Sequence, residues 1–447
     1  MMRAEDYRRD KTRPFTGAEY LESLRDGREV YINGERIADV TAHPAMRNSV
    51  RSLARLYDAL HDPKSRDRLT APTDTGSDGY THKYFRVARS SAELVAQQGA
   101  IADWARMSYG WMGRTADYKA ALMNTLGANA DWYGPFKDNA LAWHKRAQES
   151  VLFMNHAIVN PPIDRHKPAD AVKDVFVHIT RETDAGIYVS GAKVVATSSA
   201  LTHYNFLAQS SATVTEDPSL SVMFIVPMNA PGIKMFCRVS YEQTANTVGH
   251  PFDYPLSSRF DENDAILVLD NVFVPWEDVL VLRDAAKILS FHPASGFMHG
   301  YCFQGCTRFA VKLDFLAGLL AKALRATGGD AFRGNQAALG EVIALRHMFW
   351  SFSNAMACNP LPWANGAVLP NLEAALSYRT FMSEAYPRVI DTVRRVIASG
   401  LIYLPSSAAD FGNPEIDRYL AQYVRGSNDM GHVERIKIMK LLWDATG

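Results

Sequence analysis

The sequence predicts an α+β protein of several domains, with a mainly helical first part, a β-rich middle and a helical last part. Three observations predict this fold class. The chain has 447 residues, which exceeds the size that one hydrophobic core usually serves. The spacing of apolar residues changes from helical to strand-like and back to helical along the chain. No internal repeat or low-complexity tract interrupts this order.

Residues 1–150 alternate helical patterns with turns, so we expect an N-terminal domain that is mainly helical. The segment SVRSLARLYDALHD has apolar residues at spacings of three and four and ends before Pro63. The segment TAPTDTGSDGYTHKYF is rich in Thr, Gly and Asp, which is typical of a loop. Such a loop between helices could line a binding site.

Residues 151–280 contain short runs of β-forming residues, each bounded by Gly, Pro, Asn or Asp. The runs are VKDVFVHIT, GIYVSGAKVVAT, LSVMFIVPM, GIKMFCRVS and DAILVLDNVFVPW. Five such runs predict a compact sheet or a small barrel.

Residues 281–447 return to long helical patterns separated by loops. The three clearest are CTRFAVKLDFLAGLLAKALRAT, GNQAALGEVIALRHMFWSFSNAM and EAALSYRTFMSEAYPRVIDTVRRVIAS. Helices of this length, joined by Gly, Pro and Asn, favour a C-terminal helical bundle.

The charge balance argues against nucleic acid or an anionic membrane as the main partner, because 48 Lys and Arg face 48 Asp and Glu. The first residues lack the apolar run of a signal peptide. The most apolar stretch, which begins at Leu313, is short and contains Lys322. We therefore expect a cytoplasmic protein that does not enter a membrane.

The cysteines and the common cofactor motifs exclude several classes of site. Cys237, Cys302, Cys306 and Cys358 are too few and too scattered for a disulfide framework. Cys302 and Cys306 form a CxxxC pair, but no further Cys or His lies nearby at the spacing of metal ligands, so we expect no metal site. The sequence contains no GxGxxG after a strand, no P-loop and no HExxH. A flavin, if one binds, must therefore bind outside a Rossmann fold.

Arg114 and Tyr118 are four residues apart in YGWMGRTADYKA, and His156 follows in FMNHAIVNPPIDRH. On a helix, residues at this spacing share a face, so the guanidinium and the phenol ring could converge. A cation, a hydroxyl donor and an imidazole are suited to holding a phenol by its oxygen. The alternative is that the pair lies on a solvated helix and that His156 only packs in the core.

An acidic cluster, formed by Asp261, Glu262 and Asp264, precedes the last predicted strand. Carboxylates in such a group can bind a metal, but no histidine accompanies them here. We therefore interpret the cluster as a solvated turn.

Several segments resemble the oxygenase component of the 4-hydroxyphenylacetate 3-monooxygenase family of two-component aromatic hydroxylases. They include TRPFTGAEYLESLRDGREVYINGER and FDENDAILVLDNVFVPWEDV, and the similarity runs essentially from end to end. The resemblance implies an acyl-CoA dehydrogenase-like architecture, in which a helical domain and a helical bundle flank a β-barrel-like domain. It also implies that a separate flavin reductase supplies diffusible reduced FAD.

The activity implied by the resemblance is flavin-dependent monooxygenation. A C4a-hydroperoxyflavin would hydroxylate 4-hydroxyphenylacetate, or a similar para-substituted phenol, ortho to its hydroxyl and so give a catechol. Arg114, Tyr118 and His156 fall on the family positions that contact the substrate hydroxyl. The resemblance thus implies that Arg114 stabilises the phenolate, that Tyr118 donates a hydrogen bond, and that His156 is the catalytic base.

The resemblance also implies cofactor and substrate contacts elsewhere in the chain. The flavin contacts would come from His156, from Pro162, Ile163, Asp164 and Arg165, and from Thr197, Ser198 and Ser199. Ser210, Ser211 and Thr213 fall in the family's variable loop, which closes over the substrate. From the letters alone, this loop could equally be an ordinary exposed hairpin.

The family assembles as homotetramers through late helices, and we expect the same here. Its members continue beyond LLWDATG with a segment that contacts FAD and neighbouring subunits, so we expect some flavin contacts outside this chain. Three alternatives stay open. They are an acyl-CoA dehydrogenase-type flavoenzyme, a hydroxylase of coumarate, a tyrosine derivative or carrier-bound β-tyrosine, and a non-catalytic helical scaffold.

Overall fold

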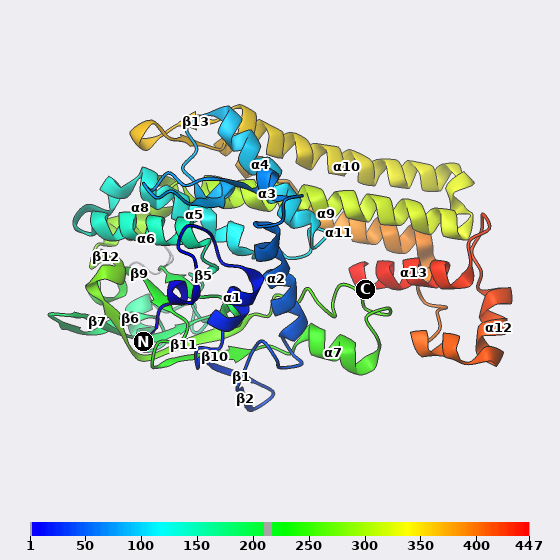
Figure 1. Cartoon of the computed structure of the whole chain (residues 1–447), viewed down its shortest axis with the longest axis horizontal. Helices are drawn as coiled ribbons and strands as arrows, with labels where there is room; N and C mark the ends of the chain where they lie inside the picture. The colour runs from blue at the N-terminus through cyan, green and yellow to red at the C-terminus, as the bar shows by residue number, and fades with distance from the viewer. Residues whose placement is uncertain (1, 210–216, 447) are drawn as a thin grey trace.

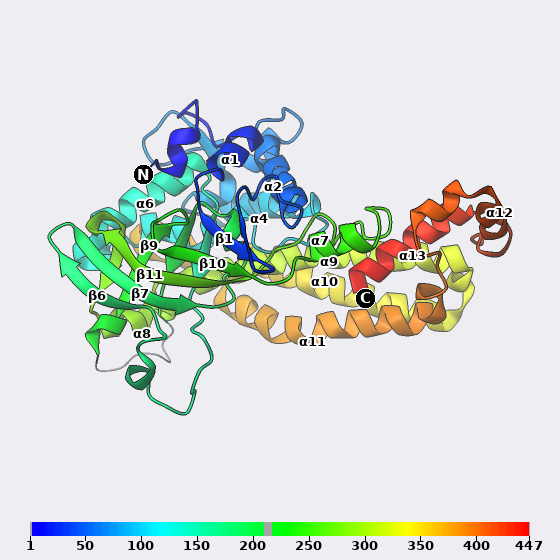
Figure 2. The ribbon, with the colours of Figure 1, turned by 90° about the horizontal axis from the view of Figure 1, so that it is seen from below.

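The computed structural model describes residues 2–209 and 217–446, and it has the helix, sheet, helix order expected from the sequence. The strands gather at one end of the molecule, and the three longest helices run from there to the other end (Figures 1 and 2). The predicted α+β fold class is therefore confirmed. The divisions at about residues 150 and 280 stay a proposal.

The N-terminal region contains six α-helices, of which the second corresponds to the predicted helix that stops before Pro63. They are α1 (Gly17–Ser23), α2 (Arg47–Ala59), α3 (Arg66–Leu69), α4 (Ser91–Arg106), α5 (Ala116–Ala128) and α6 (Lys137–Ser150). The Thr16 hydroxyl caps α1 by accepting a hydrogen bond from the Glu19 amide, and the Glu19 carboxylate in turn accepts one from the Thr16 amide. The cap fixes where the first helix begins.

Two sheets form the middle region, and all five predicted runs contribute a strand. The six-stranded sheet has the order β2 (Glu35–Ile37), β1 (Glu29–Ile32), β10 (Ile233–Cys237), β11 (Ala265–Pro275), β7 (Gly186–Lys193) and β6 (His178–Thr183). The four-stranded sheet has the order β12 (Val279–Leu282), β9 (Val222–Pro227), β8 (Tyr204–Leu207) and β5 (Met154–Ala157). Two strands of the larger sheet thus come from the N-terminal region, which was expected to be mainly helical.

The C-terminal region is a bundle of long helices, as predicted. Its helices are α8 (Ala285–Ala294), α9 (Phe297–Thr327), α10 (Arg333–Cys358), α11 (Leu372–Ile397), α12 (Pro414–Tyr423) and α13 (His432–Thr446), with the short β13 (Leu361–Pro362) and β14 (Val368–Leu369) between α10 and α11. Helix α9 packs against α4, α5, α10, α11 and α13 and is therefore the centre of the bundle. A Cβ atom on Gly300 would lie 2.9 Å from the Cβ of Ala121, so this glycine lets α9 approach α5 closely.

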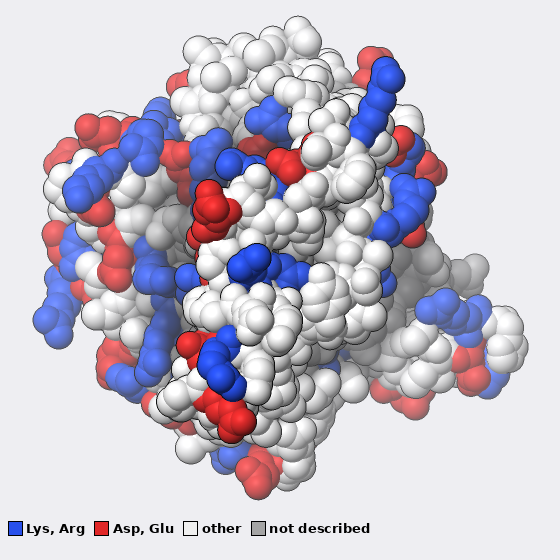
Figure 3. All heavy atoms as spheres, turned by 90° about the vertical axis from the view of Figure 1, so that its right-hand side faces the viewer, with Lys and Arg blue, Asp and Glu red and all other residues white. Residues whose placement is uncertain are grey.

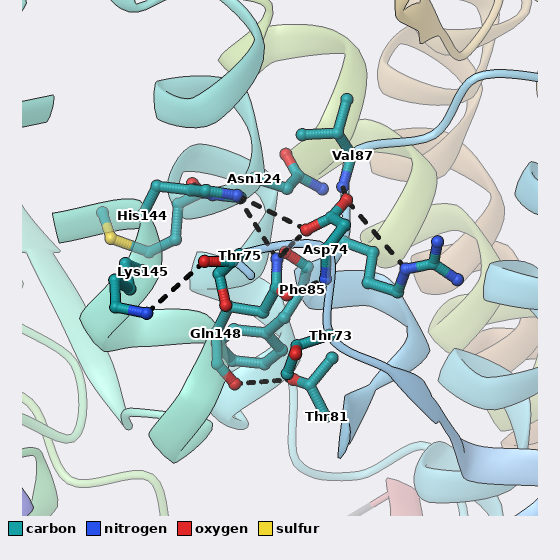
Figure 4. Close-up of polar contacts among 12 residues, drawn as sticks. Thr73, Asp74, Thr75, Thr81, Phe85, Val87, Asn124, His144, Lys145 and Gln148 are labelled. Carbon is teal, nitrogen blue, oxygen red and sulfur yellow. Dashed lines mark hydrogen bonds and ion pairs between the residues drawn. The ribbon is translucent and has the colours of Figure 1, made fainter. Parts of the chain in front are cut away.

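Residues 70–85, the segment TAPTDTGSDGYTHKYF that was predicted as a loop between helices, hold α6 in place. They contain two short paired strands, β3 (Thr70–Pro72) and β4 (Tyr80–His82). The Gln148 side chain on α6 donates to the Asp74 carboxylate at 2.6 Å and accepts from the Asp74 amide at 2.9 Å (Figure 4). The Thr81 hydroxyl donates to the Gln148 carbonyl at 2.7 Å. Because Gln148 is fully buried, these hydrogen bonds satisfy its polar groups and stabilise the packing of residues 70–85 against α6.

One buried carboxylate ties the middle region to the N-terminal helices. Glu242 lies on α7 (Tyr241–Val248) and is fully buried. Its carboxylate accepts hydrogen bonds from the Asn48 amide, the Ser49 amide and the Ser49 hydroxyl, at 2.7 to 2.8 Å. Because those amides belong to the first turn of α2, Glu242 acts as a cap supplied from another part of the chain.

Charges of both signs are mixed on the face of the molecule in Figure 3. This pattern agrees with the equal numbers of basic and acidic residues. Within residues 2–209 and 217–446, no helix is both long enough and apolar enough to cross a membrane.

We expect Glu242→Ala to lower the free energy of unfolding by about 3 kcal/mol, because three buried donors lose their acceptor. Glu242→Gln keeps one acceptor oxygen and should cost clearly less. Thermal unfolding followed by circular dichroism compares the two variants. An unchanged midpoint for Glu242→Ala would show that this tie does not stabilise the protein.

Candidate active site

Arg114, Tyr118 and His156 lie together in the structure. The Arg114 guanidinium carbon is 4.1 Å from the centroid of the Tyr118 ring, and the Tyr118 and His156 ring centroids are 5.8 Å apart. One detail of the prediction is wrong, because α5 begins at Ala116 with Thr115 as its N-cap, so Arg114 precedes the helix. The guanidinium and the ring therefore meet at the start of the helix, through a cation–π contact.

The register of β5 decides where His156 points. β5 pairs in parallel with β8, and His156 lies opposite Phe206. Side chains alternate along a strand, so Asn155 points to the other face, where its amide donates to the Ser199 hydroxyl at 3.2 Å. His156 is thus directed toward α5 and α9, where its ring contacts Tyr118 and Phe297.

The environment of His156 disfavours a charged imidazole. Burial, together with the charges of Lys119, Arg114 and His292, lowers the pKa of His156 well below its usual value near 6.5. Among the described residues, its buried Nδ1 atom has no hydrogen-bond partner. Burial also raises the pKa of Tyr118, although Arg114 opposes this shift. At neutral pH the site therefore presents a neutral imidazole, a phenol hydroxyl and a permanent guanidinium.

Glu262 fixes the loop that carries Arg114. Its carboxylate accepts hydrogen bonds from the Gly113 amide at 2.8 Å and from the Arg114 amide. Its neighbour Asp261 is only 5% exposed and pairs with Arg238 at 2.7 Å. The interpretation of this acidic cluster as a solvated turn is therefore wrong for Asp261, which is buried, whereas Glu262 is half-buried and the Asp264 side chain is 37% exposed. All three carboxylates accept hydrogen bonds from protein donors.

The structure adds four residues that sequence reasoning missed, namely Lys119, His292, Phe297 and Tyr301. The Lys119 ammonium lies 4.2 Å from the Tyr118 ring centroid and 4.6 Å from that of Phe297. Tyr301 and Phe297 share the first turns of α9, with ring centroids 5.1 Å apart. A lysine inside the small and apolar run ADYKAALM was a signal for a buried charge, but nothing local marked the aromatic residues.

Arg114 and Thr197 line one cavity of about 390 Å³, which Arg238 and Arg308 also line. The turn that presents Thr197 contains Val195 and Ser198, whose φ angles of 54° and 61° are unusual for residues other than glycine. The Thr197 hydroxyl donates to Asp264 at 2.5 Å. Three carboxylates, those of Asp261, Glu262 and Asp264, line the same cavity, so its wall carries charges of both signs.

Ser198 and Ser199 are placed differently from Thr197, because both are buried. The Ser198 amide donates to the Asn263 carbonyl at 2.8 Å. The Ser199 hydroxyl accepts from Asn155 and from Asn205, the latter at 2.9 Å. The hydroxyl of Ser199 is therefore already used within the protein.

Pro162, Ile163, Asp164 and Arg165 line a second cavity, of about 470 Å³, on the loop that follows β5. All four are exposed. The Asp164 carboxylate pairs with Lys167 at 2.7 Å, and its backbone has a positive φ of 43°. Ser210, Ser211 and Thr213, which were assigned to the substrate loop, lie outside the described residues.

Two family models match almost all of the chain. The model for the N-terminal part of 4-hydroxyphenylacetate 3-hydroxylase matches residues 16–281, and the model for its C-terminal part matches residues 289–447.

Individual proteins of this kind are also similar. The chain is 60% identical to the 4-hydroxyphenylacetate 3-monooxygenase oxygenase component of Pseudomonas aeruginosa, over all of this chain and 86% of that protein. It is 57% identical to the oxygenase component of a 4-nitrophenol 2-monooxygenase from a Rhodococcus species, over 97% of this chain and 83% of that protein. A crystal structure of a 4-hydroxyphenylacetate 3-monooxygenase oxygenase component with FAD and 4-hydroxyphenylacetate matches with a TM-score of 0.90. The match has 29% identity and covers 96% of this chain and 89% of that one.

The buried site predicts an unusual titration of His156. In histidine-labelled protein, its NMR signal should stay that of the neutral ring as the pH falls through 6.5, where an ordinary histidine becomes charged. Lys119→Met should move the pKa of His156 upward, because it removes one of the positive groups that lower it. Lys137→Met, at an exposed position that pairs with Asp131, is the control and should leave it unchanged. A midpoint near 6.5 in the unmodified protein would contradict the proposed burial.

Proposed function

The chain belongs to the 4-hydroxyphenylacetate 3-hydroxylase family, and we propose from this premise that it is the oxygenase component of a two-component aromatic hydroxylase. Its substrate is 4-hydroxyphenylacetate or a similar para-substituted phenol, and its product is the catechol. The observation that carries this proposal is the convergence of Arg114, Tyr118 and His156 on one buried point.

The reaction takes one phenol, one O₂ and one reduced FAD, and it gives one catechol, one water and oxidised FAD. When bound, reduced FAD supplies the two electrons and the activated oxygen. The protein provides orientation, exclusion of water and charge. An electrophilic oxygen attacks the ring more readily when the substrate is a phenolate, so the protein must stabilise negative charge on the phenolic oxygen.

The three convergent side chains meet this requirement. Arg114 supplies a permanent cation, and the hydrogen bond that its guanidinium donates to the Gly113 carbonyl is long, at 3.5 Å. It is therefore free to stabilise a phenolate, which typically lowers the pKa of a neighbouring acid by about 1–3 units. Tyr118 and His156 add hydrogen-bonding groups for the same oxygen.

The flavin contacts that we propose come from two places. Pro162, Ile163, Asp164 and Arg165 form an exposed loop directly after β5, so their backbone amides and the Arg165 guanidinium are available to a ligand. Thr197 borders the cavity that Arg114 also borders. Ser198 and Ser199 would shape this turn, because their polar groups already bond within the protein. The donor set suits an anionic or carbonyl-rich ring system.

Acyl-CoA dehydrogenation would instead need a free carboxylate as base beside the flavin. Two carboxylates lie close to Arg114 and Tyr118, and each has protein donors. Glu262 accepts the amides of Gly113 and Arg114, while Asp117 accepts from Thr115 and Gln304. Because both carboxylates are already hydrogen-bonded to protein donors, the site favours hydroxylation over acyl-CoA dehydrogenation.

The identity of the phenol depends on parts of the chain other than the three convergent residues. Relatives of nearly equal identity act on different phenols, namely 4-hydroxyphenylacetate and 4-nitrophenol. The loop that contains Ser210, Ser211 and Thr213 is the segment to which we assign this choice. Coumarate, tyrosine derivatives and carrier-bound β-tyrosine belong to the same range of candidates.

We further propose a separate reductase as partner and a homotetramer as the working assembly, with the cytoplasm as its location. Large apolar side chains on the late helices are exposed in the single chain. They include Leu376 and Phe381 on α11 and Tyr423 on α12, with exposed fractions of 44%, 45% and 71%. Apolar surface of this kind is typical of contacts between subunits.

The function is tested with purified protein, a flavin reductase, FAD, NADH and a panel of para-substituted phenols, with products separated by chromatography. We expect conversion of 4-hydroxyphenylacetate or a close analogue to its catechol. Arg114→Met should reduce kcat by about 100-fold or more, because a positioned charge is lost. Arg106→Met removes a surface arginine that pairs with Asp103, and it should keep full activity. Dehydrogenation of an acyl-CoA by protein that retains oxidised FAD would overturn the proposal.

The assembly is tested by light scattering. We expect a mass of four chains for the unmodified protein, and a smaller species for Phe381→Glu, because a buried charge would oppose contact between subunits. Arg36→Glu, at an exposed position on β2, is the control and should not alter the mass. A monomer at micromolar concentration would contradict the proposed homotetramer.

A further inference from the structure

Lys119 is an unusual lysine, because it is buried and the described residues offer its ammonium only aromatic faces and no hydrogen-bond acceptor. Its side chain is only 1% exposed. Within residues 2–209 and 217–446, its ammonium makes no hydrogen bond. An isolated buried ammonium costs several kcal/mol, so such a group is normally neutral or paired. The missing partner indicates that something else occupies this position when the protein works.

The surroundings of Lys119 are those of the candidate active site. Its nitrogen faces the rings of Tyr118 and Phe297, at 4.2 Å and 4.6 Å from their centroids. The His156 ring contacts the same two rings, at 5.8 Å and 5.9 Å between centroids. Lys119 and His156 therefore share a space bounded by Tyr118 and Phe297.

The other titratable or charged groups around this space come from every element packed on it. They are Arg114 before α5, His156 on β5, His292 on α8, Tyr301 and Cys302 on α9, and Arg379 on α11. Apart from the thiol and the phenols, all of these groups are basic. Lys119 thus has no protein anion as a counter-ion in this space, and an anionic ligand would supply one.

We propose that Lys119 accepts the proton of the substrate's phenolic hydroxyl and then remains as the ammonium counter-ion of the phenolate. This inference rests on the proposed function. In the step, the phenol O–H bond breaks, its electron pair stays on oxygen, and an N–H bond forms on the neutral Lys119 amine. After the ring gains its new hydroxyl, the ortho carbon loses its hydrogen as a proton, which ends in the water that the overall reaction releases. The ammonium then returns its own proton to the first oxygen.

Acid–base strength favours Lys119 over His156 for this role. Burial, and then Arg114, lowers the pKa of Lys119 well below its usual value near 10.5, so the neutral amine becomes accessible. The pKa of His156 is lowered well below 6.5, so its ring is a weak acceptor for a phenol, whose pKa is about 10. His156, to which the sequence analysis gave the role of base, then holds the phenolate as a hydrogen-bonding neighbour.

The test compares wild type with Lys119→Met, which keeps the length of the side chain and removes the amine. Without flavin, binding of 4-hydroxyphenylacetate at neutral pH should produce the ultraviolet difference band of a phenolate in wild type and not in the variant. With reduced FAD and O₂, the variant should lose about 100-fold in kcat at neutral pH. Alkaline pH, or a nitrophenol that is already ionised, should restore most of that loss.

Two controls separate the possible outcomes. Lys312→Met removes another lysine stacked on aromatic rings, those of Trp111 and Tyr386, and it should retain the phenolate band. Thermal unfolding of Lys119→Met should match or exceed that of wild type, since an unpaired buried amine is lost. A phenolate band and full turnover in Lys119→Met would overturn the role of Lys119. Absence of hydroxylation in wild type would instead overturn the proposed function.

Discussion

The structure depends on one electrostatic constraint: two basic side chains, Arg114 and Lys119, are packed against the same aromatic ring at the start of α5. Arg114 and Lys119 both lie over the Tyr118 ring, at 4.1 Å and 4.2 Å from its centroid. In a dry environment a second positive charge beside Arg114 is unfavourable, so burial and Arg114 together favour the neutral form of the Lys119 amine. A site built this way stabilises an anion that binds there, and its imidazole is neutral chiefly because of burial, to which the nearby basic groups add.

The fold supplies the rigidity that this arrangement needs. α5 lies between α9, which Gly300 allows to approach Ala121, and α6, which the Asp74 and Gln148 side chains hold. Glu262 fixes the residue before the helix by accepting two backbone amides, although it comes from a distant part of the chain. The N-terminal helices, the sheets and the bundle therefore each contribute one wall, and none of them forms the site alone.

Two buried lysines, Lys193 and Lys119, differ in the hydrogen-bond acceptors that the protein provides for them. The Lys193 ammonium donates to four acceptors, the Ile158 and Ala208 carbonyls and the side chains of Asn160 and Gln209. It thereby joins the ends of β5 and β8, and burial lowers its pKa to about 7. Lys119 is equally buried but has no hydrogen-bond acceptor among residues 2–209 and 217–446. The hydrogen bonds of Lys193 are therefore satisfied within the protein, whereas in our proposal the phenolic substrate provides the partner of Lys119.

The sequence by itself determined the fold class, the five strand-forming runs of the middle region and the three long helices, because these follow from local periodicity. It also singled out Arg114, Tyr118 and His156, although their grouping came partly from resemblance to a family. Tertiary structure alone decided that Arg114 lies before α5, that the Asp261 carboxylate is buried, and that Lys119 finds no hydrogen-bond acceptor among the described residues. These facts depend on contacts between residues far apart in the chain, and no local pattern encodes which donor meets which acceptor.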